Sequence, residues 1–254
     1  MIIEIHPYDG SQNNVGLANK LRTIISFAYH CDTNNYKLKI VWDYFYNMFP
    51  HILDDKLFTN DNSDIKYGPP LFYPIGECNS CYGGSNVEAS IDYYSKCFPF
   101  QKYFNKLIPK SSIYDLIVSN ENHINNFFGV HLRLGDWISF AKENNLFLPS
   151  LDDYIKKIDI LLEENNGFYF TSDDIHSYSV MKNRYGSKVF YIENKNLNRM
   201  DSSNFDFAYI DMVLLSKTKF ILGNTHSTFS YHSARINNIP LYSYDGKEWL
   251  QVVG

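Results

Sequence analysis

Segment 129–136, Gly-Val-His-Leu-Arg-Leu-Gly-Asp, joins an apolar run to an imidazole, a guanidinium and a carboxylate. Residues 127–132 are predicted to form a buried strand, and because strand side chains alternate, His131 and Arg133 share one face while Leu132 points to the other. A guanidinium at the carboxyl end of such a strand suits a two-bond contact with phosphate. The alternative is an ordinary strand that ends in a Gly-Asp turn, with an arginine paired to a surface carboxylate.

A second polar segment, 14–22, reads Asn-Val-Gly-Leu-Ala-Asn-Lys-Leu-Arg and follows a predicted first strand. Its glycine allows close approach of a ligand, and the free amides of a helix start favour an anion. Asn19, Arg22 and Ser26 recur at helical spacing and form a polar stripe. This stripe either approaches a ligand or is a solvated helix face.

A third segment, 170–174, carries a predicted strand into two carboxylates. Asp173 and Asp174 each have two interpretations. One aspartate could accept hydrogen bonds from a ribose or a base edge, and the other could cap the helix that follows.

The fourth group consists of Asp211 and the segment 223–230, Gly-Asn-Thr-His-Ser-Thr-Phe-Ser. Asp211 lies among apolar residues at helical spacing, so its carboxylate needs a partner in the folded protein. The segment leaves a predicted strand and opens a helix, a geometry in which amides and hydroxyls hold a phosphate.

Several catalytic patterns are missing from the sequence, among them the P-loop, Gly-x-Gly-x-x-Gly, His-Glu-x-x-His and Gly-x-Ser-x-Gly. No two aspartates stand two positions apart, so an Asp-x-Asp metal clamp is absent from the sequence. We therefore expect no metal, and arginine and amides must meet any phosphate charge. Cys78 and Cys81 have zinc-knuckle spacing but lack a second ligand pair, which makes a structural metal there the lesser alternative.

The predicted elements that position these segments alternate between strands and helices, as in a mostly parallel α/β fold. Strands are predicted at 2–6, 38–42, 127–132, 167–170, 188–192, 219–222 and 240–242. Helices are predicted at 15–31, 91–107, 112–125, 151–164, 175–185, 204–216 and 227–237. Residues 50–88 are rich in proline and glycine, and we expect them to form an acceptor loop or lid. The cleanest boundary falls near residues 108–126 and predicts two lobes, 1–120 and 121–254.

Composition excludes several classes of protein. The chain has 254 residues, 44% hydrophobic and 20% charged, which is ordinary for a folded protein. A net charge of -5 argues against broad binding to nucleic acid. We expect no signal peptide and no membrane-spanning segment. Four cysteines are too few for a disulfide scaffold of this length, so a cytoplasmic protein with reduced thiols is expected.

In this order, the segments resemble motifs of the fucosyltransferase superfamily, which includes α-1,2-, α-1,6- and protein O-fucosyltransferases. Residues 16–22 look like its Gly-Leu-Gly-Asn-Arg-Leu-Arg, and residues 131–136 are similar to its hallmark His-Val/Ile-Arg-Arg-Gly-Asp. Residues 171–174 look like its Ser/Thr-Asp-Asp element, and residues 211–230 resemble its block that ends in Asn-Ser-Ser/Thr-Phe-Ser. The resemblance covers residues 14–43 and 128–236.

The resemblance implies a GT-B-like fold in which two small Rossmann-type lobes face a cleft. It also implies inverting, metal-independent transfer of fucose from GDP-fucose to a hydroxyl of a glycan or glycoconjugate. Arg133 would hold the β-phosphate of the departing GDP, where charge develops, and His131 would steady the same region or contact the sugar. Lobe 121–254 would bind the nucleotide sugar and lobe 1–120 would serve the acceptor. The proposed donor contacts are Asn19, Arg22, Asp173, Asp174, Asp211, Asn224, Ser227, Thr228 and Phe229.

The chain departs from the superfamily pattern at three positions: Leu134 replaces the second arginine of the hallmark, and Ala18 and Lys20 replace a glycine and an arginine. Leu134 makes an inverting transferase that uses another nucleotide sugar the first alternative. A non-catalytic nucleotide-sugar-binding protein is the second, because no catalytic base is assigned.

The catalytic base is open as well, because an inverting displacement must remove a proton from the acceptor hydroxyl. Asp136 ranks ahead of Glu143 as this base. A carboxylate of the N-terminal lobe, such as Asp9 or Asp43, is the further candidate.

Overall fold

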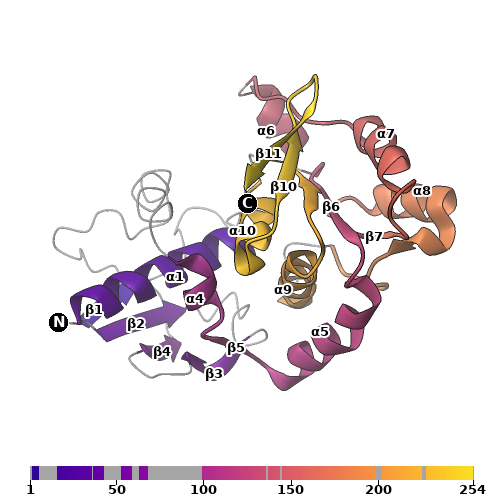
Figure 1. Cartoon of the computed structure of the whole chain (residues 1–254). Helices are drawn as coiled ribbons and strands as arrows, with labels where there is room; N and C mark the ends of the chain where they lie inside the picture. The colour runs from indigo at the N-terminus through magenta and orange to yellow at the C-terminus, as the bar shows by residue number, and fades with distance from the viewer. Residues whose placement is uncertain are drawn as a thin grey trace. The chain divides into compact units, whose positions relative to one another are not determined.

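The structure is a computed structural model that describes residues 2–5, 16–35, 37–42, 53–58, 63–67, 99–135, 137–143, 145–197, 202–224 and 227–253. The chain divides into two compact units (Figure 1). The first comprises residues 1–114 with 199–206, and the second comprises residues 115–198 with 207–254.

The first unit contains a three-stranded parallel sheet, in the order β1 (Ile2–Ile5), β2 (Lys37–Trp42) and β4 (Ser63–Tyr67). Helix α1 (Leu17–Asn34) connects β1 to β2 and ends at Asn35, whose left-handed conformation suits a helix C-cap. The predicted apolar face of this helix is buried, namely Leu17, Leu21, Ile24, Ile25 and Ala28. Strand β3 (Leu53–Phe58) pairs antiparallel with β5 (Leu107–Pro109).

In its described part, residues 99–107, the predicted helix over 91–107 is confirmed at 100–104 and wrong at its end. Helix α4 (Phe100–Phe104) is short, and the chain is extended in β5. Pro109 explains the change, because the residue before a proline is pushed toward extended backbone.

The second unit contains a six-stranded sheet in the order β11-β10-β9-β6-β7-β8. Its parallel strands are β6 (Phe128–Leu132), β7 (Phe168–Ser172), β8 (Val189–Phe190), β9 (Ile221–Gly223) and β10 (Leu241–Tyr244), and β11 (Trp249–Val253) pairs antiparallel with β10. Strands β7 and β8 lie on one side of β6, and β9 and β10 lie on its other side, as in the Rossmann order. The direction reverses between β6 and β9, which makes their carboxyl ends the expected ligand edge.

Helices α7 (Leu151–Leu161) and α8 (Ile175–Tyr185) cover one face of this sheet, and α9 (Ser202–Ser216) and α10 (Thr228–Asn237) cover the other (Figure 1). Helix α5 (Ser111–Ile124) precedes β6, and α6 (Trp137–Glu143) follows it. Phe128, Val130 and Leu132 pack into the core beneath α7 and α8. Gly129 faces α9, where an added Cβ would lie 2.8 Å from Leu215 Cδ2. As predicted, alternation along β6 thus directs the side chains of Leu132 and His131 to opposite faces of the sheet.

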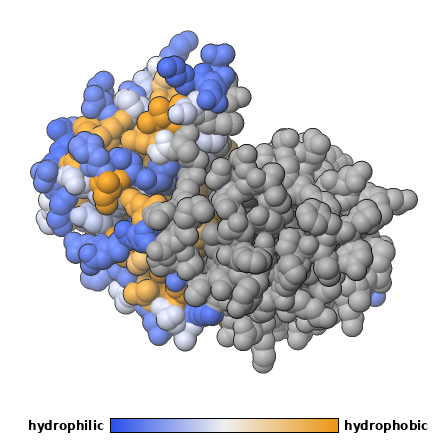
Figure 2. Space-filling view, turned by 180° about the vertical axis from the view of Figure 1, so that it is seen from behind, coloured by the Kyte–Doolittle hydropathy of each residue, from blue (hydrophilic) through white to orange (hydrophobic). Residues whose placement is uncertain are grey.

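Large hydrophobic side chains are exposed on several elements of the described residues. Hydrophilic residues and hydrophobic ones are interspersed over the coloured part of Figure 2. Helix α5 exposes Tyr114, Leu116 and Val118, and single exposed side chains such as Ile160 and Ile175 lie on other helices. Within the described ranges, no helix combines the length and apolar character needed to cross a membrane. The cytoplasmic location stays a prediction.

Candidate functional site

The carboxyl ends of three strands bring predicted site residues to one edge of the six-stranded sheet. Arg133 follows β6, Asp173 follows β7 and Asn224 follows β9. Strand β6 pairs with both β7 and β9, so these residues follow three adjacent strands. The edge at which they gather is where ligands bind in parallel α/β sheets.

Asp173 holds the turn after β6. Its Oδ2 lies 3.2 Å from Arg133 Nε, and its Oδ1 accepts hydrogen bonds from the backbone N–H groups of Leu134 (2.8 Å) and Gly135 (3.2 Å). The approach is close, because a Cβ on Gly135 would lie 2.6 Å from Oδ2. One carboxylate therefore fixes the turn and orients the guanidinium, which favours a two-bond contact with an anion such as phosphate.

Asp174 caps helix α8, as was predicted for one of the two aspartates. Its carboxylate accepts hydrogen bonds from the backbone N–H of Ser177 at 2.8 Å and from the Ser177 hydroxyl. Partial burial opposes ionisation, but these hydrogen bonds hold the pKa of Asp174 below its ordinary value. The two neighbouring carboxylates thus have different contacts: Asp173 contacts the turn after β6, and Asp174 begins α8.

His131 is buried beside α10. Its Nδ1 lies 2.6 Å from Ser230 Oγ, and its ring centroid lies 4.7 Å from that of Phe229. The Tyr154 hydroxyl donates to the His131 carbonyl oxygen at 3.3 Å. Burial lowers the pKa of His131 to about 3, and the positive charges of Arg133 and Lys195 act in the same direction. The imidazole is therefore neutral at neutral pH.

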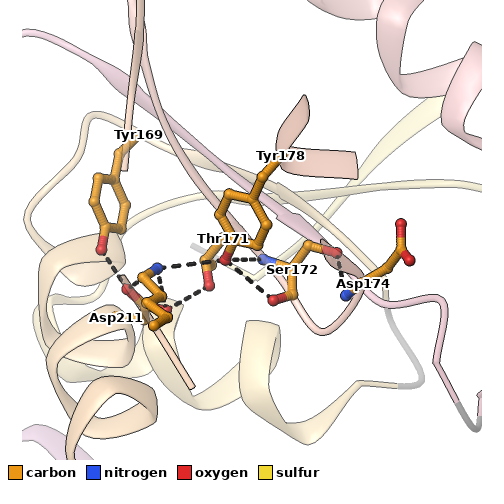
Figure 3. A network of polar contacts seen from close by, with 7 residues as sticks. Tyr169, Thr171, Ser172, Asp174, Tyr178 and Asp211 are labelled. Carbon is orange, nitrogen blue, oxygen red and sulfur yellow. Dashed lines mark hydrogen bonds and ion pairs between the residues drawn. The ribbon is translucent and has the colours of Figure 1, made fainter. Parts of the chain in front are cut away.

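Asp211 on α9 lies at the centre of a buried polar network (Figure 3). Its carboxylate accepts hydrogen bonds from the Tyr169 hydroxyl and, at 2.6 Å, from the Thr171 hydroxyl. Lys195 Nζ lies 2.7 Å from each carboxylate oxygen, and the Lys195 and Asp211 side chains are only 4% and 6% exposed. Together these groups occupy the roughly four acceptor positions of a carboxylate. Asp211 therefore has the partner that its apolar surroundings require.

Lys195 is a site residue that the sequence analysis missed. It lies in the segment after β8, and its ammonium also contacts the Tyr178 hydroxyl at 3.4 Å. Burial would lower the pKa of Lys195, but the charge of Asp211 raises it above its ordinary value. The one signal in the sequence was indirect, since a carboxylate among apolar residues calls for a cation from elsewhere.

Tyr178 joins α8 to the end of β7. Its hydroxyl accepts a hydrogen bond from the Ser172 N–H at 2.9 Å and donates one to the Ser172 carbonyl oxygen at 3.1 Å (Figure 3). A pocket of about 510 Å³ lies between α8 and residues 191–197, and both Tyr178 and Lys195 line it. The buried network therefore reaches a cavity large enough for a small ligand.

Helix α10 is the next described element after β9 and begins at Thr228. Ser227 is the N-cap residue, but its side chain makes no capping hydrogen bond, and its backbone N–H donates to the Asn224 carbonyl oxygen at 3.0 Å. Asn224 and Ser227 are buried, whereas Thr228 and Phe229 are half-buried. Thr225 and His226 lie outside the described residues. A helix start at this edge offers amides to an anion.

The polar stripe of α1 belongs to the first unit. Arg22 and Ser26 are each 6% exposed and Asn19 is half-buried, so the stripe is not a solvated helix face. Glu143 is exposed at the end of α6. The other candidates, Asp136, Asp9, Asp43, Cys78 and Cys81, lie outside the described residues. Within those residues, no group of three or more His, Cys, Asp or Glu side chains could hold a metal.

The sequence matches no protein-family model and no curated protein. The structure is similar to solved fucosyltransferases. The α-1,6-fucosyltransferase NodZ soaked with GDP-fucose has 13% identity and a TM-score of 0.64, with 100% of this chain and 99% of that chain covered. NodZ from Bradyrhizobium gives a TM-score of 0.67 at 13% identity, with 99% and 98% covered. POFUT1 in complex with GDP-fucose gives 0.56 at 13%, with 94% of each chain covered.

These similarities show that the chain has the fold of the fucosyltransferase superfamily. They confirm the α/β, GT-B-like fold class expected from the sequence.

Proposed function

We propose that the protein transfers fucose from GDP-fucose to a hydroxyl of a glycan or glycoconjugate. The observation that carries this proposal is Arg133, held by Asp173 at the carboxyl end of β6 in a fold shared with fucosyltransferases. The fold alone does not identify the reaction. The site adds a fixed cation at the ligand edge, which is the group that a departing diphosphate requires.

In the proposed reaction, the acceptor oxygen attacks C1 of fucose while the bond from C1 to the β-phosphate oxygen breaks. Negative charge grows on the departing GDP, and the Arg133 guanidinium stabilises it. The amides at the start of α10, with Ser227 and Thr228, would hold phosphate oxygens. This arrangement needs no metal, because the chain's own cation and amides meet the diphosphate charge. Attack from the face opposite the leaving group inverts C1.

The remaining assignments follow the same proposal. Lobe 121–254 binds the nucleotide sugar, with Asp211, Asn224 and Phe229 near it, and lobe 1–120 serves the acceptor. Asn19 and Arg22 stay proposed donor contacts from the first lobe. Asp136 stays the first candidate for the base, followed by Glu143 or an N-terminal carboxylate such as Asp9 or Asp43.

One observation favours a second candidate function. Leu134 stands where the superfamily hallmark has an arginine, and its backbone N–H is held by Asp173. A site with one arginine fewer could accept a different nucleotide sugar. Calorimetric titration with GDP, UDP and dTDP separates the two, since we expect binding of GDP alone. Turnover of GDP-fucose would exclude a purely binding role.

Arg133→Ala tests the leaving-group role. Loss of a charge-assisted contact of about 1.5–3 kcal/mol predicts a GDP affinity at least about tenfold lower, with slower transfer. Arg184→Ala is the matched control, because Arg184 forms an exposed ion pair with Asp159 on the same lobe. The proposed role fails if Arg133→Ala binds GDP within about twofold of the unaltered protein, well short of that loss.

A further inference from the structure

The imidazole of His131 has two neutral forms, and the position of its proton decides what the ring can do. A proton on Nε2 makes that nitrogen a hydrogen-bond donor, whereas a proton on Nδ1 leaves Nε2 as an acceptor and a base. Within the described residues, Nδ1 is the ring nitrogen with a hydrogen-bond partner, the Ser230 hydroxyl at 2.6 Å. What Ser230 can donate or accept therefore determines the form of the ring.

Ser230 lies on α10 and packs against His131 of β6 and the end of β9. Its side chain is fully buried, and the backbone N–H of Asn224 points to its Oγ at 3.4 Å. Gly223 makes this approach possible, because a Cβ at that position would lie 2.6 Å from Oγ. The hydroxyl therefore lies against the end of β9 while it contacts the histidine on β6.

Counting hydrogen bonds distinguishes the two forms. If Nδ1–H donated to Ser230, the hydroxyl oxygen would receive two N–H groups, and its own proton would need a third partner. Among the residues that the structure describes, the hydroxyl bonds only His131 and Asn224. A buried hydroxyl proton without an acceptor is costly, so the other arrangement is favoured. There, Asn224 N–H donates to Oγ, the hydroxyl donates to Nδ1, and the ring proton lies on Nε2.

We propose that Ser230 is a positioning residue that fixes His131 in the neutral form protonated at Nε2. In this form, Nε2–H of His131 donates a hydrogen bond to an oxygen atom of the bound nucleotide. The part that concerns the nucleotide rests on the proposed function. In this form neither ring nitrogen can take the proton of the acceptor hydroxyl, since Nε2 already carries one and Nδ1 accepts from Ser230. The catalytic base is therefore another group. The low pKa of His131, which results from burial, is consistent with a ring that stays neutral.

Long-range proton–nitrogen NMR of the histidine side chains tests the assignment without any ligand. We expect the His131 signals, identified by their loss in His131→Asn, to show the form protonated at Nε2 from pH 5 to 8. Ser230→Ala should convert this pattern to a mixture of both neutral forms. A wild-type spectrum with the proton on Nδ1 would overturn the proposal, even if the Ser230 variant did not fold.

Ser233→Ala is the matched control. Ser233 is also fully buried on α10, but its hydroxyl donates to the Phe229 carbonyl oxygen at 2.8 Å instead of contacting His131. We expect this variant to keep the wild-type NMR pattern and GDP affinity, while Ser230→Ala weakens GDP binding by about tenfold. Equal losses in the two variants would indicate a purely structural serine and would overturn the positioning role. A wild-type protein that shows the Nε2 form but does not bind GDP would contradict the proposed function and leave the assignment of the ring proton intact.

Discussion

Asp173 and Asp174 show how adjacent residues of the same type acquire different roles. The sequence assigns them a ligand contact and a helix cap without deciding between them, because both precede a helix. The structure pairs Asp173 with Arg133 and the turn after β6, and it places Asp174 at the N-cap of α8. The deciding contact for Asp173 comes from residues about 40 positions away, which local spacing cannot reveal.

Alanine variants of these two aspartates should therefore differ in what they impair. Asp173→Ala removes the partner that orients Arg133, so we expect about tenfold weaker GDP binding, the loss expected when one charged hydrogen bond is removed. Asp174→Ala removes a cap and should lower the free energy of unfolding by about 1 kcal/mol with GDP affinity unchanged. Urea unfolding and calorimetric titration measure the two effects. If Asp174→Ala weakened GDP binding as much as Asp173→Ala, the division of roles would be wrong.

Helices α9 and α10 are held to the sheet by contacts that differ in chemistry. Helix α10 packs closely on β9 because Gly223 has no side chain, whereas α9 is held by Asp211 and its ion pair with Lys195. Both contacts lie at the carboxyl edge of the sheet. The helices therefore determine where His131 and the end of β7 are fixed.

Gly223→Ala should disturb the first of these contacts. The new Cβ would lie 2.6 Å from Ser230 Oγ and 2.7 Å from its Cβ, so α10 must shift. Overpacking of this kind costs about 1–3 kcal/mol of unfolding free energy. Gly16→Ala is the control for overpacking, because its Cβ would meet no atom within 4 Å. Any loss of stability in that variant reports the replaced N-cap of α1. An unfolding midpoint in urea unchanged by Gly223→Ala would contradict the tight packing.

Lys195→Met should disturb the second contact. It leaves the Asp211 carboxylate buried without a cation, which costs about 3–5 kcal/mol. Adding Asp211→Asn removes the unpaired charge, so the double variant should recover part of that loss in urea unfolding. A double variant no more stable than Lys195→Met would argue against an ion pair at this position.

At the scale of the whole molecule, the sequence predicts those features of the fold that follow from local periodicity. Alternation of strands and helices predicted the α/β fold, and the period of two along β6 predicted that His131 and Leu132 face opposite sides. Lys195 and Ser230 were not identified as partners of Asp211 and His131, since each pair joins residues from different elements. The order β8-β7-β6-β9 then unites these pairs at one edge, a consequence of topology that spacing along the chain does not contain.

The free energy of unfolding should depend on pH in acid because His131 is buried in its neutral form. In the unfolded chain this histidine binds a proton below pH 6.5, but in the folded protein it does so only near pH 3. The unfolded state therefore binds more protons between these values, so stability falls as the pH drops from 6.5 toward 3, by up to about 1.4 kcal/mol per pH unit. Asp153, Asp159 and Asp174, whose pKa values lie below 3.8, add losses of stability only at the acid end.

Urea unfolding of the wild type and of His131→Asn at pH 7, 6, 5 and 4.5 measures the contribution of His131. We expect a shallower pH dependence in the variant, and parallel curves would show that His131 is not buried in its neutral form.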